Sequence, residues 1–260
     1  MDVKINNLLK ADTFTSLFQH IKLFTEHVNI TFTDDKMYLQ TMDSSRVSIV
    51  EINLPKLWFD EYEMKDCSVT MGIQANVLFK VLNSRDKDQI IHLEYEKDSD
   101  KLYIHFTSEN KQSFDKNFEI NLIDLDVELL EIPDFNSNTD ISVPSSYFAG
   151  IITQLQIFGD TIEFQCSEEK VQLISHSVDS GKMKVDIKVD ELTEYSISES
   201  EEVMKISFSL SRIHNICSYH KLSKEVDIIL THDYPMKIIY KLDEEEATMT
   251  FYLAPKIGDD

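Results

Sequence analysis

The sequence has little of what flexible, disulfide-bonded or membrane-spanning proteins need. Its 260 residues include only 5 Gly, 5 Pro and 3 Cys, which leaves little room for low-complexity linkers. Cys67, Cys166 and Cys217 lie far apart and form no CxxC or Cys/His pair, so they indicate a reducing compartment and argue against a zinc site. There is no signal-peptide pattern, and no apolar run approaches the roughly 20 residues that span a bilayer. We therefore expect a soluble, intracellular protein without a membrane partner.

Common catalytic motifs are also missing. The sequence contains no Walker A loop, GxGxxG, GxSxG or HExxH. Its eight His residues show no metal-ligand spacing, and Ser44-Ser45 has no evident base beside it. Paired acids such as Asp124 and Asp126 are far more often solvated charge than metal ligands in so acidic a protein. We expect no enzymatic activity, no cofactor and no metal.

The chain is a duplicated unit. When it is slid against itself by 134 residues, the apolar residues of one amphipathic segment coincide with those of another without a gap. The pairs include Phe14/Phe148, Leu17/Ile151, Phe18/Ile152, Ile21/Leu155, Val28/Ile162, Ile30/Phe164 and Leu39/Leu173. At an offset of 135, Ile73, Leu78, Val81, Ile91 and Leu93 fall on Phe208, Ile213, Ile216, Val226 and Ile228. Helical and strand periods match in the same order, so chance similarity of two amphipathic segments is the weaker explanation.

Each half therefore has the same expected order of elements: a helix, several strands, a second short helix and further strands. The spacing of Phe14, Leu17, Phe18 and Ile21 predicts the first helix. The second helix is expected at residues 74–83. Pro144 and Ser145 suit a helix start in the second half. We predict an α+β fold of two similar domains, each with β-sheets on one side and two helices on one face. The expected boundaries are 1–121, a connector at 122–137, and 138–260.

Acidic residues are absent where the helices are expected. Net charge is −22, with 47 Asp and Glu, so the molecule as a whole should not attract nucleic acid or anionic lipid. Yet 13–24, 73–85, 141–158 and 205–224 hold no acid, whereas the chain average predicts about 11 in their 63 residues. One interpretation is that all four helices face one polyanion, such as the backbone of duplex DNA. The other is that the helices are buried on both faces, which suits the uncharged third window best.

A central segment joins the two copies. Phe118, Ile120 and Leu122 alternate with polar residues, as in a strand. From Ile123 the alternation gives way to an acidic run with interspersed apolar residues, which ends at Pro133. We interpret this run as an extended connector that lies across a surface and keeps apolar side chains available.

Three motifs carry a resemblance to a known family. The segment 39–48, LQTMDSSRVS, resembles the LQxMDSSHVS segment of the eukaryotic proliferating cell nuclear antigen family of DNA sliding clamps. The run LIDLDVE at 122–128, with Leu130, Ile132 and Pro133, is similar to the interdomain connecting loop of that family, and YLAPKI at 252–257 to its C-terminal ending. The motifs occur in the family's order and span the chain.

The resemblance implies a homotrimeric, head-to-tail ring with strands outside and helices lining a channel for duplex DNA, bound without sequence preference. It further implies a processivity factor for DNA replication and repair that tethers DNA polymerase, is opened by an ATP-driven clamp loader, and binds other proteins through short peptides. A nuclear location is implied, or a viral replication site if the chain is viral.

The resemblance also implies three sets of site residues. In the DNA-binding set, Lys22 and Lys80 match basic positions of the family, and Arg212 and Lys221 lie in the matching helix but are displaced from the family's basic position. Arg85 is included for its charge in an acid-free window. The partner-peptide groove comprises Met42, Arg46, Val47, Ile49, Leu130, Ile132, Pro133, Pro235, Tyr252, Ala254 and Pro255, although these residues could instead fill an interdomain core. The subunit interface comprises Phe114 and Phe118 on one edge strand, and Leu173, Ser175 and Ser177 on the neighbour's.

Departures from the family pattern point to altered partner or DNA contacts. Gly150 and Thr153 replace arginines on the third helix, Arg46 replaces a groove histidine, and Glu131 replaces a glycine of the connector. Two alternatives stay open. One is a scaffold that binds partner peptides without encircling DNA; the other is a subunit of a heterotrimeric, checkpoint-type clamp.

Overall fold

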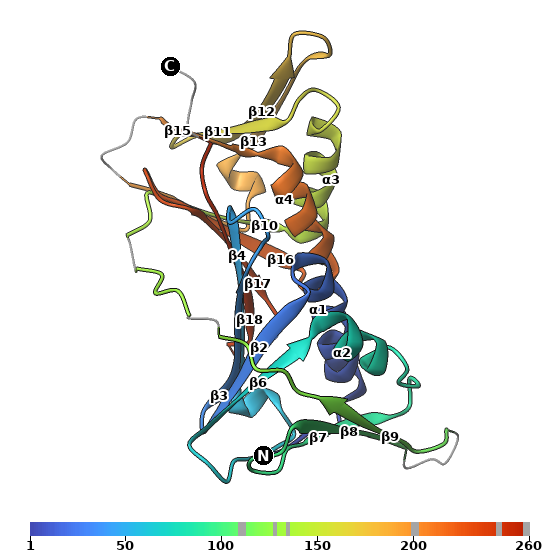
Figure 1. Cartoon of the computed structure of the whole chain (residues 1–260). Coiled ribbons are helices and arrows are strands. Elements are labelled where there is room, and N and C mark those ends of the chain that lie inside the picture. Colours follow the sequence, from blue (N-terminus) through green and yellow to red (C-terminus); the bar gives the residue numbers. More distant parts are fainter. Residues whose placement is uncertain (109–112, 127–128, 134–135, 199–202, 243–245, 257–260) are drawn as a thin grey trace. The chain divides into compact units, whose positions relative to one another are not determined.

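The computed structural model describes residues 1–108, 113–126, 129–133, 136–198, 203–242 and 246–256 (Figure 1). The chain forms two compact units. Unit 1 consists of Met1–Arg46, Glu51–Leu130 and Leu242–Thr248, and unit 2 of Val47–Val50, Glu131–Lys241 and Met249–Asp260. Of the motif residues, Val127, Glu128 and Ile257 lie outside the described residues. None of the described helices is both long and apolar enough to cross a membrane.

The elements of the first half follow the predicted order after β1, a strand that the sequence analysis did not predict. They are β1 (Asp2–Ile5), α1 (Leu8–Phe24), β2 (His27–Thr33), β3 (Lys36–Met42), β4 (Ser48–Pro55), the 3-10 helix η1 (Lys56–Trp58), β5 (Glu61–Glu63), β6 (Ser68–Gln74), α2 (Ala75–Leu82), β7 (Ile90–Glu94), β8 (Lys101–Thr107) and β9 (Lys116–Asn121).

The second half repeats this order, with η3 as one additional element. It contains β10 (Thr139–Pro144), α3 (Ser145–Leu155), β11 (Thr161–Cys166), β12 (Lys170–Ser177), β13 (Gly181–Lys188), η2 (Val189–Glu191), β14 (Glu194–Ile197), β15 (Met204–Ser209), α4 (Leu210–Cys217), η3 (Ser218–Lys221), β16 (Glu225–Leu230), β17 (Met236–Lys241) and β18 (Thr248–Leu253).

The sheet orders confirm the duplication. Unit 1 has the order β5-β1-β7-β8-β9, and unit 2 has β14-β10-β16-β17-β18. The other strands of unit 1 follow the order β4-β3-β2-β6, and their counterparts in unit 2 follow the order β13-β12-β11-β15. Within its own unit, each strand thus has the neighbours that its counterpart has in the other unit. The predicted α+β fold with two similar domains is confirmed.

The helices form where the apolar spacing predicts them. The Asn7 side chain caps α1 by accepting from the backbone N–H groups of Leu9 (2.9 Å) and Lys10 (3.2 Å). The helix then buries Phe14, Leu17, Phe18 and Ile21, all at most 2% exposed. In each unit the two helices lie side by side, α1 against α2 and α3 against α4 (Figure 1). Each unit therefore presents the outer faces of a helix pair.

One predicted interface strand is not an edge. We expected Leu173, Ser175 and Ser177 to lie on an open edge, but their strand, β12, pairs with β11 on one side and β13 on the other. Leu173 and Ser175 are 1% and 0% exposed. The expected edge position was therefore wrong, because β13 and not β12 lies at this end of the sheet. The other predicted interface strand, β9, does lie at the end of its sheet. Phe118 belongs to β9, whereas Phe114 precedes β9 and is 92% exposed.

Candidate nucleic-acid surface and partner groove

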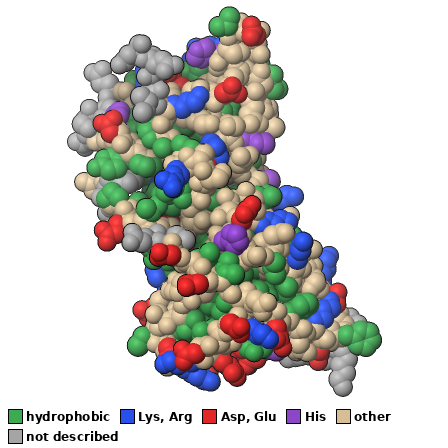
Figure 2. All heavy atoms as spheres, in the orientation of Figure 1, with side chains coloured by type: hydrophobic (Ala, Val, Ile, Leu, Met, Phe, Trp, Pro, Cys, Tyr) green, Lys and Arg blue, Asp and Glu red, His purple; other side chains and the backbone are tan. Residues whose placement is uncertain are grey.

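The helix pair of unit 1 carries two of the predicted DNA-binding lysines. Lys22 is in the last turn of α1 and half-buried, and its Nζ lies 3.6 Å from the centre of the Phe79 ring on α2. This cation–π contact holds the ammonium group at the junction of the two helices. Lys80, the next residue of α2, is exposed. Figure 2 shows Lys and Arg side chains gathered over α1 and α2, so this helix face is cationic although the protein is acidic.

Arg85 does not fit the predicted DNA-binding set. Its side chain is only 4% exposed; one guanidinium nitrogen pairs with Asp12 of α1, and another donates to the carbonyl oxygen of Gln89 at 2.6 Å. Arg85 therefore ties α1 to the segment after α2. This contact also accounts for Asp12, the acid that α1 carries before the predicted acid-free window, because its charge is paired with Arg85.

His20 adds no positive charge to this face at neutral pH. It lies on α1 two residues before Lys22. Burial lowers the pKa of His20, and the nearby Lys22 charge lowers that pKa further. The imidazole is therefore neutral in the folded protein over a wider pH range than an exposed histidine would be.

Unit 2 places its positive charge differently. α3 has no charged residue, in agreement with the sequence, and Arg212 on α4 is half-buried. Lys221, predicted on the same helix as Arg212, instead follows it in the short helix η3. The predicted cations of unit 2 are thus divided between α4 and the segment that follows it, and α3 has none.

A hollow of about 530 Å³ lies between this segment and the start of α3. It is lined by Ser145, Ser146, His220, Lys221, Leu222, Ser223 and Lys224. α3 has no side-chain N-cap, because Pro144 occupies that position. A helix N-terminus carries partial positive charge and amide donors; in α3 the Ser145 N–H already donates to the Lys224 carbonyl oxygen at 2.9 Å. With Lys221 and Lys224 beside it, both exposed, the hollow has the chemistry of a phosphate contact. Sequence reasoning missed Lys224 as a site residue, although it ended the acid-free window.

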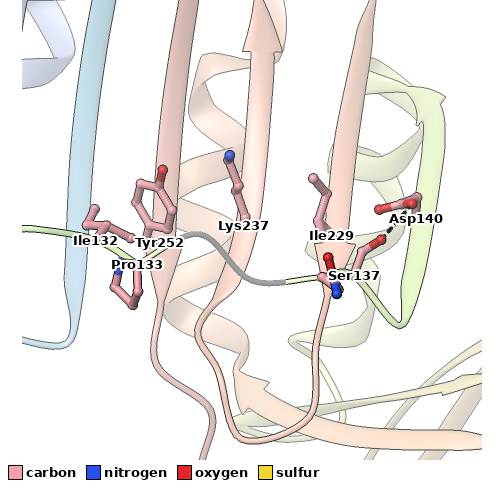
Figure 3. Close-up of a pocket in the computed structure, with 8 residues that line it drawn as sticks. Ile132, Pro133, Ser137, Asp140, Ile229, Lys237 and Tyr252 are labelled. Atoms are coloured by element: carbon pink, nitrogen blue, oxygen red, sulfur yellow. Dashed lines mark hydrogen bonds between the residues drawn. The ribbon is translucent and has the colours of Figure 1, made fainter.

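Unit 2 also contains a pocket of about 260 Å³ beside the connector (Figure 3). Three predicted groove residues line it: Ile132 and Pro133 from the connector, and Tyr252 from β18. The rest of the lining, which the sequence did not predict, is Asn136, Ser137, Asp140, Ile229 and Lys237. Pockets with an apolar part and a few polar groups are typical of binding sites.

The polar groups of the pocket are held in place. Asp140 accepts hydrogen bonds from the hydroxyl groups of Ser137 (2.9 Å) and Ser196 (3.0 Å). Lys237 projects from β17, and its Nζ lies 5.8 Å from the centre of the Tyr252 ring (Figure 3). An occupant of this pocket would therefore meet an ammonium group next to the aromatic ring. Lys237 alternates with buried Met236 and Ile238 along β17, a signal that the sequence already contained.

The other predicted groove residues are at least partly accessible within their own units. In unit 2, Val47 is 37% exposed, while Ile49, Pro235, Ala254 and Pro255 are half-buried. The backbone N–H of Ala254 donates to the carbonyl oxygen of Val47 at 3.1 Å, which brings the C-terminal motif to that segment. In unit 1, Met42 is half-buried, Leu130 is 42% exposed, and Arg46 is exposed with a positive φ of 59°.

The start of the connector is fastened to unit 1 by backbone contacts. The N–H of Ile123 donates to the carbonyl of Gly72 at 2.9 Å, and the Asn29 amide donates to the carbonyl of Leu125 at 3.2 Å. A Cβ atom on Gly72 would lie 2.2 Å from the Ile123 oxygen, which only glycine avoids. The connector therefore runs in direct contact with β6.

Gln40 holds the connector again at Leu130. Its side-chain oxygen accepts from the Leu130 N–H at 2.7 Å, and its amide donates to the Leu130 carbonyl at 2.9 Å. Both backbone groups of Leu130 are satisfied in this way, so its side chain is free to face solvent. Gln40 is part of the LQTMDSSRVS motif, but sequence reasoning did not assign it this role.

Two family models match the chain. Residues 5–129 match the model described as Proliferating cell nuclear antigen, N-terminal domain, and residues 131–256 match Proliferating cell nuclear antigen, C-terminal domain. The change from one match to the other falls where the compact units also divide, between Leu130 and Glu131.

Proposed function

Because the chain belongs to the proliferating cell nuclear antigen family, a family of non-enzymatic DNA sliding clamps, we propose that three copies close into a homotrimeric ring around duplex DNA. The ring tethers DNA polymerase and other replication and repair proteins in the nucleus, or at a viral replication site. Its mechanism is topological: a polymerase bound to an encircling ring stays at a high effective concentration near the primer end.

The observation that supports this proposal best is the duplicated helix pair. Each unit offers an acid-poor helix surface next to positive charge, Lys22 and Lys80 in unit 1, and Arg212, Lys221 and Lys224 in unit 2. Such groups attract phosphates without reading bases. The remaining surface is strongly acidic, which keeps the grip on DNA weak enough for sliding.

Ring closure requires strand edges that are free to pair. Among the described residues, β9 and β13 are the long terminal strands that no other segment covers. The connector bonds to β6, the Lys256 N–H bonds to Ser207 of β15, and β5 and β14 are short. β13 carries Lys182, Lys184 and Lys188. We propose that β9 of one subunit pairs with β13 of the next, since open edges otherwise invite aggregation.

The partner groove is proposed to take a short peptide in a single helical turn with aromatic anchors. Ile132, Pro133 and Tyr252 supply apolar contact area. Leu130 adds an exposed apolar side chain from the connector, whose backbone Gln40 holds at this point. Lys237 beside Tyr252 favours a carboxylate on the peptide next to its aromatic anchor. Loading onto DNA is assigned to a separate ATP-driven clamp loader.

Loading on a nicked circular plasmid tests the encirclement. Clamp and loader are incubated with the circle and ATP, and bound protein is separated by gel filtration before and after linearisation. We expect retention on the circle and release when the DNA is cut. Retention that survives linearisation, or no retention at all, would contradict encirclement and favour a peptide-binding scaffold.

Light scattering in solution tests the assembly. We expect a mass of three chains of 30.2 kDa each. Lys184→Pro and Val185→Pro each remove one backbone N–H from β13, and only one of these two successive N–H groups points to the open edge. The variant that removes the N–H at the open edge should reduce the mass to one chain. A wild-type monomer that trimerises only with other proteins would favour the heterotrimeric, checkpoint-type alternative.

A further inference from the structure

A cluster of metal-ligating side chains lies on the five-stranded sheet of unit 1, away from the surfaces described so far. Strand pairing sets Asp2 of β1 opposite Glu94 of β7, and His92 of β7 opposite His105 of β8. The sequence predicted no metal site, because these residues are too far apart to form a ligand motif. They become neighbours only when β1, β7 and β8 pair.

The cluster has the spacing of a metal site. One ligand atom each from Asp2, His92 and Glu94 lies within 4.8 Å of the other two. His92 Nε2 is 3.0 Å from Asp2 Oδ1 and 3.8 Å from Glu94 Oε1. Tetrahedral zinc with bonds of about 2.0–2.2 Å sets its ligand atoms roughly 3.3–3.6 Å apart, and the two measured distances lie on either side of that range.

His105 supports the cluster from the next strand. Its Nε2 lies 2.9 Å from the second carboxylate oxygen of Glu94, and its Nδ1 lies 2.6 Å from Asn117 Oδ1. Both nitrogens of His105 are thus engaged, and the contact orients the Glu94 carboxylate toward His92. Metal-ligating carboxylates characteristically receive such a supporting hydrogen bond.

The neighbouring Lys4 side chain does not repel a metal strongly. Lys4 lies opposite His92 in the β1–β7 pair, but its Nζ is 2.6 Å from Glu61 Oε2, so its charge is already paired. The cluster is accessible: the side chains of His92, Asp2 and Glu94 are 19%, 37% and 42% exposed. A metal ion could therefore enter from solvent and keep a position open.

We propose that Asp2, His92 and Glu94 form a zinc-binding site, with His105 as the residue that positions Glu94. One imidazole and two carboxylates suit a borderline ion such as Zn²⁺, whereas Mg²⁺ and Ca²⁺ prefer oxygen ligands alone. The three protein ligands leave the fourth tetrahedral position to water or to a side chain of a bound protein.

This site is independent of the DNA surface and the groove. Along β1 and β7, buried Val3, Ile5, Ile91 and Leu93 alternate with the ligands, and both strands contact α1. The ligands therefore project from the face of the sheet opposite α1. Bound zinc joins β1 to β7 and, through Glu94 and His105, reaches β8, so it should raise the thermal stability of unit 1 without DNA or peptide.

Isothermal titration calorimetry with Zn²⁺ tests the proposal on tag-free full-length protein. Cys67 is exposed, so all variants carry Cys67→Ser to exclude thiol binding. Burial raises the pKa of the Cys166 and Cys217 thiols to about 12, so these stay protonated. We expect one zinc ion per chain, at least tenfold weaker binding in His92→Gln and in Asp2→Asn, and a smaller loss in His105→Gln.

His176→Gln is the matched control, because His176 is an exposed histidine in a strand of unit 2. Binding in this variant should equal that of the parent, and the absorption of the Co²⁺-substituted parent should show four-coordinate geometry that His92→Gln lacks. The proposal is overturned if the parent does not bind zinc, if His92→Gln binds it as tightly as the parent, or if His176→Gln loses it equally.

Discussion

In each unit the first helix is joined to the segment after the second helix, a contact that we call the junction. The two units make this junction with different side chains. In unit 1 the first helix is tied to the segment after the second helix by a charged pair, Asp12 with buried Arg85. By the offset of the repeat, Arg85 corresponds to His220 and Asp12 to Ser146 in unit 2. There the neutral Ser145 hydroxyl makes the tie, with contacts to the carbonyl oxygens of His220 (2.8 Å) and Lys224 (3.2 Å).

The difference shows where each unit can offer positive charge. In unit 1 the arginine at the junction is buried and neutralised, so free cations are found on the helices themselves, at Lys22 and Lys80. In unit 2 the junction is closed by a hydroxyl, and Lys221 and Lys224 beside it stay available for a phosphate. Identical topology therefore supports two arrangements of charge, and the helix without charge, α3, belongs to the unit whose junction is cationic.

The two units also differ at the residues that end η1 and η2. Trp58 ends η1, is 1% exposed and packs against Phe14 and Phe59, whereas Glu191, the last residue of η2, is exposed. Trp58→Ala should lower the free energy of unfolding by about 3–5 kcal/mol, because it leaves a large cavity. Glu191→Ala should cost about 1 kcal/mol or less. Urea denaturation followed by circular dichroism measures both, and equal effects would contradict the assigned core.

The segments that follow the last strand of each unit are the next comparison. β9 leads into the connector, whereas β18 leads directly to Ala254 and Pro255. Leu130→Ala with Ile132→Ala should weaken binding of a synthetic peptide, one helical turn with two aromatic anchors, by ~2 kcal/mol or more, as expected for interface anchors.

The matched control for this pair is Leu129→Ala, since Leu129 is also on the connector and 54% exposed but is not predicted in the groove. Calorimetry should show unchanged affinity for it. If alanine at each of the three positions weakened peptide binding equally, the connector would contribute general apolar surface rather than two anchors.

Transplanting the unit 2 residue into the unit 1 junction gives the third test. Arg85→His removes a buried guanidinium and leaves the Gln89 carbonyl without its donor, which should destabilise the protein by about 1–3 kcal/mol. Asp12→Ser should cost less, because the Asp12 side chain is 60% exposed. Thermal unfolding measures both. Neither change should alter retention on circular DNA, and a specific loss of retention in Arg85→His would return Arg85 to the DNA-binding set.

The charge comparison itself can be tested by neutralisation. Lys22→Gln with Lys80→Gln, and separately Lys221→Gln with Lys224→Gln, should each reduce affinity for a short duplex several-fold. Each lost phosphate contact should also lower the salt dependence, the slope of log K against log salt, by about 0.9. Fluorescence anisotropy across salt concentrations measures both quantities, with Lys237→Gln as a control outside the candidate DNA surface. An unchanged slope in the unit 2 pair would remove the hollow at α3 from the DNA surface.

The smallest expected effect concerns pH. His20 corresponds to Gln154 in unit 2, and the folded state lowers the pKa of His20. Below the ordinary histidine pKa of about 6.5, the unfolded chain binds a proton that the folded chain resists. His20 therefore favours unfolding as pH falls through that range, and its contribution disappears above it. His20→Gln should flatten the decrease in melting temperature between pH 7 and 5; a steeper decrease would reverse the assigned sign.

Much of the fold could be predicted because the spacing of apolar residues reveals the repeat. The helical spacing of Phe14, Leu17, Phe18 and Ile21 is enough to predict α1. The alignment of the two halves with each other gives the order of the elements along the chain. The edge strand could not be predicted in this way. β12 and β13 alternate similarly, and which of them ends the sheet depends on partners far along the chain.

The sites were predictable to different degrees. Ile132, Pro133 and Tyr252 were identified through motifs, and the structure brings them to one pocket. Lys237 and Asp140 escaped notice, because a polar residue on an alternating strand looks like ordinary surface until a pocket forms beside it. Arg85 was assigned to DNA on charge alone, and sequence cannot reveal that its guanidinium is buried against Asp12.

The contact between Gly72 and Ile123 has a consequence for sequence variation in relatives of this protein. Position 72 is in a strand, where a β-branched residue would ordinarily be favoured, yet any side chain there collides with the connector. Selection on that position therefore acts through the connector and not through the strand. A relative with a side chain at this position must lead its connector along another path, so one residue, remote from the groove in sequence, indicates which relatives share this route.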